Sequence, residues 1–387
     1  MNGVAKLYPL FFLFLLSCGY KAQLNKGKLL SVKDVEEVPF QFRDNFIYVE
    51  VKINGKDKLF ILDSGAPNVI DKSIQEELGF KKVYDTEFQD AASRSRKLEM
   101  VKIDHIKFGD IEIKNSVAAV ADFSKFTCLD IDGIIGTNIM SLFDWKIDYV
   151  NEVAQLYRNG IPMDSLKEFS APIPLRMNVQ KSPFIKMQVG NTTFNSVDID
   201  LGSNGGIGVQ RWDQFNLNNY PDNNWVYGET SMGIHGPITD TTRIVPMDNI
   251  TLGNYSIPKT RMTIKPTSTS KIGNRFLKNY ELILSWKKEA MYLKNVSEPD
   301  TTWNKNVVYL GWKNNEIYIK GYSKDSKIQD HGIAIGDKVI RVFNLAIDEL
   351  DESNFCFLKS VWKGQVLLQV DKTETCECVE LIVEEIR

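Results

Sequence analysis

Two segments of the chain lead an apolar run into an aspartate and then a glycine, a combination of residue types that supports acid–base chemistry. Asp63 is followed two residues later by Gly65, and Asp200 is followed two residues later by Gly202. Glycine at this place permits a tight turn and lets another part of the backbone approach closely. Two carboxyl groups held side by side cannot both ionise easily, so they share a proton and divide into a general base and a general acid. The pair therefore predicts hydrolysis by a water molecule, with no metal, cofactor or histidine.

The elements that would position these aspartates recur in the same order in both parts of the chain. Gly136 follows Asp63 by 73 residues, Gly273 follows Asp200 by 73 residues, and an isoleucine precedes each of these two glycines. We interpret the recurrence as an internal duplication, which supplies the second carboxyl group. Short strand patterns separated by Gly, Asn and Asp turns predict a mostly β chain. The short helices predicted are 72–78, 137–142 and 274–277.

The first of the two segments resembles the active-site motif of aspartic peptidases. Asp63-Ser64-Gly65 follows an apolar strand pattern, and residues 132–136 come after it at the spacing of that family. With its second copy, the chain looks most like the retropepsin-like domains that are fused in tandem in secreted bacterial proteins. The resemblance covers residues 44–296 and implies a pepsin-like bilobal arrangement of two double-ψ β-barrel halves. The two expected halves are 44–165 and 166–296.

By this resemblance, Asp63 and Asp200 form the catalytic dyad. The residues expected to support it are Ser64, Gly65, Gly202, Ser203, Gly136 and Gly273. The second copy departs from the family at Leu201, where the family usually has Ser or Thr, whose hydroxyl group hydrogen-bonds to the opposite loop. Ser64 can form such a bond, and Leu201 cannot. Ser203 is a candidate to hydrogen-bond the second carboxyl group instead.

Other residues near the motif are weaker candidates. Asp198 lies on the same strand face as the second aspartate, but no glycine follows it. Aspartic peptidases also close β-hairpin flaps over the substrate, and the segments 88–93 and 233–236 are candidates for such flaps. His235 is expected on an exposed hairpin loop.

Residues 303–387 follow a polar linker and resemble a PDZ domain of the bacterial type, most specifically in a Gly-Asp-Lys-Val-Ile segment. By this resemblance, Leu310, Gly311 and Trp312 belong to a carboxylate-binding loop, and a peptide would add as a strand beside residues 316–320. Trp312 is larger than the residue usual at its position. A module that braces the peptidase without binding peptides is therefore the alternative.

The N-terminus has the pattern of an export signal. Residues 7–16 form an apolar run that is too short to span about 30 Å of hydrocarbon as a helix, and the run matches the core of a secretory signal. It ends near Cys18 in a segment that resembles the lipobox of bacterial lipoproteins. The resemblance implies a signal peptide over 1–17, a lipid on Cys18, a tether over 18–43, and a periplasmic or cell-surface lipoprotein that meets the membrane only through its lipid. Simple secretion, with cleavage near Ala22, is the alternative.

Four further cysteines, Cys128, Cys356, Cys376 and Cys378, allow up to two disulfides in an oxidising compartment. The sequence favours a link from Cys356 to one of the last two cysteines, or free thiols. The Cys-x-Cys pair has no matching second pair that would complete a metal site.

The composition excludes several classes of function. The chain has 50 acidic and 47 basic residues and a net charge of −3, which argues against nucleic acid as a partner. Its three histidines are far apart in sequence, which argues against a multi-histidine metal site or a serine–histidine pair. The sequence predicts an exported aspartic endopeptidase that acts on peptides or proteins. The alternative is an inactive peptide-binding lipoprotein with a degenerate aspartic peptidase fold, which Leu201 favours.

Overall fold

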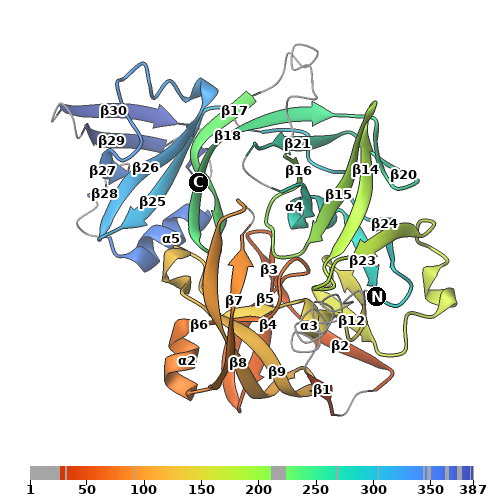
Figure 1. Ribbon diagram of the computed structural model, residues 1–387. Coiled ribbons are helices and arrows are strands. Elements are labelled where there is room, and N and C mark those ends of the chain that lie inside the picture. The colour runs from red at the N-terminus through yellow and green to blue at the C-terminus, as the bar shows by residue number, and fades with distance from the viewer. Residues whose placement is uncertain are drawn as a thin grey trace, which may run out of the picture.

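The computed structural model describes residues 27–30, 33–90, 92–210, 224–266, 269–303, 305–342, 345–346, 350–361, 366–372, 377–383 and 385–386. These residues form two β-rich halves and a smaller C-terminal module (Figure 1), which confirms the prediction of a mostly β chain. Residues 1–17, which the sequence predicts to be a signal peptide, and Cys18 lie outside the described residues. In the described part of the chain, no helix has the length and apolar character needed to cross a membrane.

The first half contains β1 (Lys28–Leu29), β2 (Val35–Pro39), β3 (Gln41–Arg43), β4 (Phe46–Ile53), β5 (Lys56–Leu62), β6 (Val69–Asp71), α2 (Lys72–Leu78), β7 (Lys81–Gln89), β8 (Ser95–Phe108), β9 (Ile111–Ala121), β10 (Gly133–Ile135), α3 (Thr137–Met140), β11 (Asp144–Asp148) and β12 (Val153–Tyr157). Asn54 and Gly55, which join β4 to β5, have φ values of 48° and 86°. Positive φ at both central residues matches the twist of a tight hairpin, so the local sequence sets this turn.

The second half contains β13 (Ile173–Met177), β14 (Pro183–Val189), β15 (Thr192–Asp200), β16 (Ile207–Val209), β17 (Asn224–Gly233), β18 (Gly236–Met247), β19 (Ile250–Leu252), β20 (Tyr255–Ile257), β21 (Thr260–Ile264), β22 (Lys271–Gly273), α4 (Asn274–Leu277), β23 (Tyr280–Ser285) and β24 (Ala290–Asn295). The three short helices predicted from the sequence are confirmed as α2, α3 and α4, although α3 ends two residues earlier than predicted.

The sequence duplication is also a duplication of strand pairing. In the first half, β10 pairs in parallel with β5 and antiparallel with β6, and β6 pairs in parallel with β9. In the second half, β22 pairs in parallel with β15 and antiparallel with β16, and β16 pairs in parallel with β21. A short helix follows β10 and another follows β22. Each aspartate therefore lies at the end of an equivalent strand.

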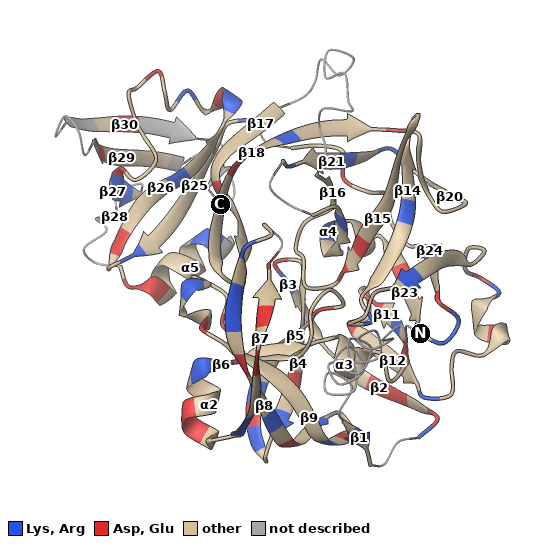
Figure 2. Cartoon of the chain, viewed as in Figure 1, with Lys and Arg blue, Asp and Glu red and all other residues tan. Residues whose placement is uncertain are grey.

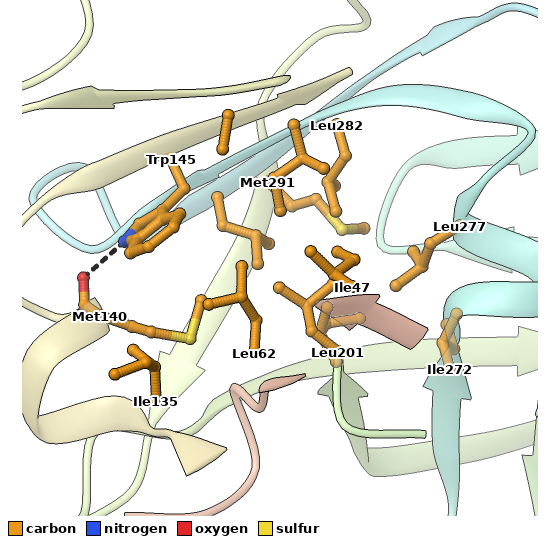
Figure 3. Close-up of a cluster of buried hydrophobic side chains, with 14 of the residues drawn as sticks. Ile47, Leu62, Ile135, Met140, Trp145, Leu201, Ile272, Leu277, Leu282 and Met291 are labelled. Atoms are coloured by element: carbon orange, nitrogen blue, oxygen red, sulfur yellow. Dashed lines mark hydrogen bonds between the residues drawn. The ribbon is translucent and has the colours of Figure 1, made fainter. Parts of the chain in front are cut away.

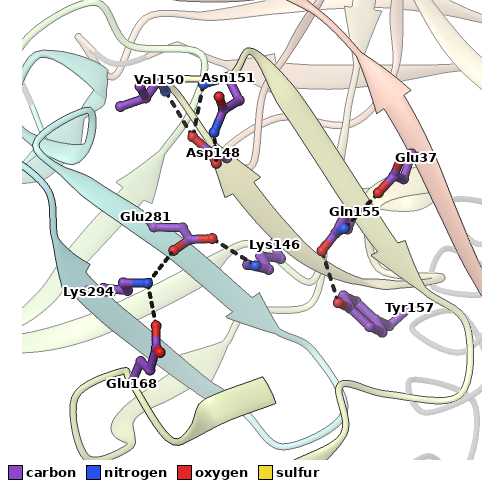
Figure 4. Close-up of polar contacts among 10 residues, drawn as sticks. All are labelled: Glu37, Lys146, Asp148, Val150, Asn151, Gln155, Tyr157, Glu168, Glu281 and Lys294. Atoms are coloured by element: carbon purple, nitrogen blue, oxygen red, sulfur yellow. Dashed lines mark hydrogen bonds and ion pairs between the residues drawn. The ribbon is translucent and has the colours of Figure 1, made fainter. Parts of the chain in front are cut away.

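One antiparallel sheet joins the two halves, in the strand order β2-β12-β11-β23-β24-β13. Figure 4 shows one ion pair that crosses the junction, with further ion pairs of the second half beside it. Lys146 of the first half lies 2.8 Å from Glu281 of the second half, and Lys294 lies 3.5 Å from the same carboxyl group. Elsewhere, acidic and basic residues are interspersed over the visible elements (Figure 2).

A single hydrophobic cluster also extends through both halves. Leu62 and Leu201, which adjoin the two aspartates in sequence, both belong to this cluster with Ile135 and Ile272 (Figure 3). All four side chains are buried, and burial of each such side chain stabilises the fold by about 1.5–3 kcal/mol. The strand ends that carry the aspartates are thus packed against a common core.

The expectation of a tether over residues 18–43 is wrong for the described residues from 27 onward. β2 pairs with β12, β1 pairs with β9, and β3 pairs with β4. Val38 and Phe40 are buried in the shared core. Burial alternates along β2, where Glu36 and Val38 are buried and Glu37 is exposed, so β2 is an outer strand with one buried face, which a polar average composition concealed.

The C-terminal module contains β25 (Val307–Lys313), β26 (Glu316–Ser323), β27 (Lys338–Val342), β28 (Leu345–Ala346), α5 (Glu352–Val361), β29 (Val366–Lys372), β30 (Glu377–Val383) and β31 (Glu385–Ile386). The expected carboxylate-binding loop is wrong, because Leu310, Gly311 and Trp312 lie inside β25 and pair with β26. The expected site of peptide addition along β26 is wrong as well. The other edge of β26 pairs with β27 and with β17 of the second half.

A disulfide ties this module to the first half. Cys128 bonds to Cys356 of α5, across 228 residues of sequence. The expected link from Cys356 to one of the last two cysteines is therefore wrong, and Cys376 lies outside the described residues. The pairing depends on a contact between distant segments that sequence spacing does not reveal. With the β17–β26 pairing, the disulfide attaches the module to both halves.

We predict that the Cys128→Ser/Cys356→Ser double variant is less stable than the wild type by about 2–5 kcal/mol, because the long closed loop restricts the unfolded chain. Urea denaturation would measure the difference. Reduced wild type is the control and should unfold at the same urea concentration as the double variant. Equal stability of the oxidised wild type and the double variant would contradict this assignment.

Candidate active site

Asp63 lies directly after β5 on a tight loop that its own carboxyl group closes. Its backbone N–H donates to the carbonyl oxygen of Ile135, at 3.0 Å, so the parallel pairing with β10 continues up to the aspartate. Its Oδ1 accepts hydrogen bonds from the N–H groups of Gly65, at 2.7 Å, and Ala66, at 3.1 Å. These bonds hold one oxygen in the loop and leave Oδ2 to face the other half.

Asp200 is the last residue of β15, opposite Gly273 of β22. Its side chain is buried, with 6% of the residue exposed. The ammonium group of Lys271 lies 2.6 Å from Asp200 Oδ2. Among the described residues, Asp200 Oδ1 is buried and has no hydrogen-bond partner. The two aspartates therefore have equivalent positions in the fold but different partners.

Glycines allow the two aspartate loops to touch. A Cβ atom at Gly65 would lie 3.3 Å from Asp63 Oδ1 and 3.5 Å from Asp200 Cγ, and a Cβ atom at Gly202 would lie only 2.3 Å from Asp63 Cγ. Each loop glycine thus lies against the carboxyl group of the opposite half. The structure brings the two predicted aspartates to one place, and a side chain at position 202 would collide with Asp63.

Ser64 links the two loops across the junction. Its hydroxyl group donates to the carbonyl oxygen of Ile199 at 2.5 Å and accepts from the N–H of Leu201 at 3.0 Å. The hydroxyl group is completely buried. Leu201 has no polar group with which to reciprocate, and its side chain fills the shared core instead (Figure 3). The cross-junction link is therefore made from the first half only.

The remaining predicted supporting residues pack behind the loops. A Cβ atom at Gly136 would lie 2.3 Å from the carbonyl oxygen of Pro67, and one at Gly273 would lie 2.6 Å from that of Ser203. Both glycines therefore permit a strand to pass close to an aspartate loop. The Ser203 hydroxyl group accepts from the N–H of Gly205, at 3.4 Å. The expected bond from Ser203 to the Asp200 carboxyl group is not among the hydrogen bonds of these described residues.

The two candidate flaps are hairpins whose tips meet. β7 ends at Gln89 and β8 begins at Ser95, and β17–β18 turns at Ile234 and His235. The guanidinium group of Arg94 donates to the carbonyl oxygens of Gly236 and Pro237, at 2.7 and 2.8 Å. His235 Nε2 lies 2.9 Å from the carbonyl oxygen of Phe88. The expected exposure of His235 is wrong, because this contact buries the ring.

The site shifts the ionisation of its carboxyl groups. Burial, and then the charge of Asp200, raise the pKa of Asp63 to about 7, although the loop N–H groups and Lys271 oppose the shift. Burial and Asp200 also raise the pKa of Asp198 well above its usual value. For Lys271, burial alone would favour the neutral amine, but the carboxyl groups around it outweigh burial and raise its pKa. A proton is therefore retained among these carboxyl groups near neutral pH.

From the sequence, Asp198 is a weaker candidate than Asp200 for the catalytic role, and Lys271 is not identified as a residue of the site. In the strand register, Asp198 and Lys271 face each other across β15 and β22. Asp198 and Lys271 each lie two residues before the aspartate or the glycine of the duplicated motif. The residues at the same positions of the first half are Ile61 and Ile134, which also face each other. An alignment of the two halves would have shown this exchange of two isoleucines for an acid and a base. Among the described residues, no group of three or more His, Cys, Asp or Glu side chains is placed to hold a metal ion.

Comparisons with known proteins agree with part of this description. Residues 49–139 match the family model described as Aspartyl protease, so the first half carries an aspartyl protease-like domain. No curated protein matches the chain significantly.

Two solved structures are similar to the chain. One is a retropepsin-like aspartic protease from Rickettsia conorii, with a TM-score of 0.26 and 22% identity over 33% of this chain and 94% of that one. The other is Basic 7S globulin from soybean, with a TM-score of 0.40 and 10% identity over 68% of this chain and 95% of that one.

We predict that Ser64→Ala destabilises the fold by about 1–3 kcal/mol, because it leaves the buried Leu201 N–H without its acceptor. Ser64→Thr is the matched control, since it keeps the hydroxyl group. Denaturant midpoints would measure both variants. A Ser64→Ala variant as stable as the wild type would contradict the proposed link between the loops.

The raised pKa of Asp63 also predicts a dependence of stability on pH. The native carboxyl group holds a proton up to pH about 7, whereas the unfolded group releases it near 3.8. The stabilising contribution is complete below pH 3.8 and is lost as the pH rises through 7. Asp63→Asn removes this contribution, so its stability relative to the wild type should increase from pH 4 to pH 8. Parallel stability curves would contradict the shift.

Proposed function

We propose that the chain is an exported aspartic endopeptidase that hydrolyses peptide bonds with Asp63 and Asp200. One observation carries the proposal: the two halves deliver their aspartates to the same place, where each carboxyl group lies against the loop glycine of the other half. Two adjacent carboxyl groups that retain one proton suit the activation of water beside a peptide carbonyl group. Aspartates that only form turns would not need to lie next to each other, so their adjacency in the duplicated fold favours a catalytic role.

The reaction needs only the two carboxyl groups and one water molecule. The ionised carboxylate takes a proton from water while the water oxygen attacks the peptide carbonyl carbon, and the protonated carboxyl group gives its proton to the carbonyl oxygen. The resulting tetrahedral diol then returns one hydroxyl proton to the second carboxylate, while the first carboxyl group protonates the departing nitrogen. The C–N bond breaks to give an acid and an amine, and both aspartates regain their initial states.

Two features support export. The apolar run before Cys18 has the length of a secretory signal, and a disulfide such as Cys128–Cys356 persists in oxidising compartments. A lipid on Cys18 would then hold the protein at a membrane surface. We propose that the C-terminal module braces the second flap hairpin through β17 and β26, in place of the peptide docking expected from the sequence.

The second candidate is a peptide-binding protein without activity. The ion pair between Lys271 and Asp200 favours it, because an ammonium group bonded to a carboxylate makes that carboxylate a weaker base. Leu201 favours it as well, since the cross-junction link is one-sided. This candidate requires peptide binding that survives the loss of either carboxylate.

Cleavage of a mixed peptide library by residues 24–387, from pH 4 to pH 8, would test the proposal. We expect Asp63→Asn and Asp200→Asn each to reduce the rate at least about 100-fold, because each removes a group that transfers protons. Asp248→Asn is the matched control, since Asp248 is exposed and lies outside the site.

Three other outcomes would overturn the proposal. Equal cleavage by the wild type and both site variants would assign the activity to another source. Loss of activity in Asp248→Asn as large as in the site variants would mean that the losses are not specific to the site. Peptide binding by all variants, with no cleavage at any pH, would favour the second candidate.

A further inference from the structure

The second half carries a charged pair for which the first half has only apolar residues. Asp198 and Lys271 are direct neighbours in the parallel register of β15 and β22. Ile61 and Ile134 occupy the corresponding register of β5 and β10. The fold therefore does not need charge at these positions, and burying charge costs free energy unless it is compensated. The pair requires an explanation beyond strand pairing.

The contacts show where the charge of Lys271 acts. Its Nζ lies 2.6 Å from Asp200 Oδ2, and the two side chains are only 21% and 9% exposed. A Cβ atom at Gly65 would lie 2.9 Å from Asp198 Oδ2 and 3.5 Å from Asp200 Cγ. Asp198 therefore faces the same point as the two aspartates of the dyad. The charges of Asp200, Asp198 and Asp63 all act on the ammonium group of Lys271, which is bonded to Asp200.

This arrangement separates the two aspartates electrostatically. An opposite charge within hydrogen-bond distance favours ionisation of the nearer carboxyl group, and that negative charge then keeps its neighbours protonated. The raised pKa values of Asp63 and Asp198 agree with this effect, because Asp200 contributes to both shifts after burial. Lys265, after β21, interacts with Asp240, on β18, and with Lys271. Burial lowers the pKa of Lys265, Asp240 opposes that shift, and the charge of Lys271 adds to it.

We infer that Lys271 is a positioning residue that assigns the two roles of the dyad, with Asp200 as the ionised base and Asp63 as the protonated acid. The inference rests on the proposed peptidase function for its chemistry but not for its charge distribution. Asp63 is suited to the acid role, because the loop N–H groups hold its Oδ1 and leave Oδ2 free to carry the proton. Asp200 is suited to the base role, because its Oδ1 has no partner among the described residues and can accept a proton from water.

The assignment has a chemical consequence. In a symmetric pair the two carboxyl groups are equally able to hold the shared proton. Each group then acts as the acid in half of the reactions and as the base in the other half. With Lys271 charged, water gives its proton to Asp200 and the peptide carbonyl oxygen receives its proton from Asp63. Asp63 keeps its proton over a pH range that extends toward neutrality, because its pKa is raised to about 7.

Carboxyl titration in the folded, mature chain tests the assignment without requiring activity. Protein labelled with ¹³C at the aspartate carboxyl carbons would be titrated by NMR, with Asp63→Asn and Asp200→Asn used to assign the two signals. In the wild type, we expect Asp200 to titrate at lower pH than Asp63. If Asp63 instead titrates at lower pH than Asp200 in the wild type, that result alone overturns the inference.

Variants of Lys271 provide the second arm. We expect Lys271→Met to raise the titration midpoint of Asp200 by about 1–3 pH units, because the positive charge that favours its ionisation is gone. Lys271→Arg should keep the wild-type order. Lys265→Met is the matched control, since it removes a partly buried lysine of the same half that forms no hydrogen bond or ion pair with Asp63 or Asp200 among the described residues. An Asp200 midpoint that is unchanged in Lys271→Met, or that shifts equally in Lys265→Met, would overturn the inference.

The pH dependence of kcat/KM separates this inference from the proposed function. If Lys271→Met moves the acidic limb of the pH profile to higher pH, together with the titration midpoint of Asp200, the charge assignment and the peptidase function both stand. If the wild type shows the expected titration order but cleaves no peptide, the charge assignment stands and the peptidase function fails. If the wild type cleaves peptides and Lys271→Met has the same pH profile, the function stands and the inference fails.

Discussion

Burial of several carboxyl groups at one point is the constraint on which the site depends. Asp63, Asp198 and Asp200 converge where two strand ends meet, in surroundings that disfavour uncompensated charge. The protein compensates in three ways: loop N–H groups bond to Asp63, the Lys271 ammonium group bonds to Asp200, and protons are retained on the other carboxyl groups. The proposed reaction depends on this compensation, because a carboxyl group that holds a proton near neutral pH can act as an acid.

The fold holds these groups together by means that are mostly apolar. The parallel pairs β5–β10 and β15–β22 end at the aspartates, and the core that contains Leu62 and Leu201 fixes the two ends against each other. The six-stranded sheet and the Ser64 hydroxyl group add hydrogen bonds across the same junction. Leu201 contributes to the junction by apolar burial alone: its side chain cannot hydrogen-bond to the opposite loop, but it is fully buried in the shared core.

The C-terminal module and the flap hairpins form a second connection between the halves. Arg94 and His235 join the hairpin tips, β17 is shared with the module, and Cys128–Cys356 returns the module to the first half. The hairpin β17–β18 is therefore held both by the module and by the first half.

The sequence by itself determined the duplicated plan, the two aspartate loops with their glycines, the three short helices and the mostly β character, because these depend on local periodicity and on fixed spacings along the chain. Only the tertiary structure decided the bond from Lys271 to Asp200, the partner of Cys128, the burial of His235 and the strand that contains Trp312. It also decided that residues before 44 belong to the sheets. Each of these depends on which strands become neighbours and in which register, and contacts between segments far apart in the chain set that choice.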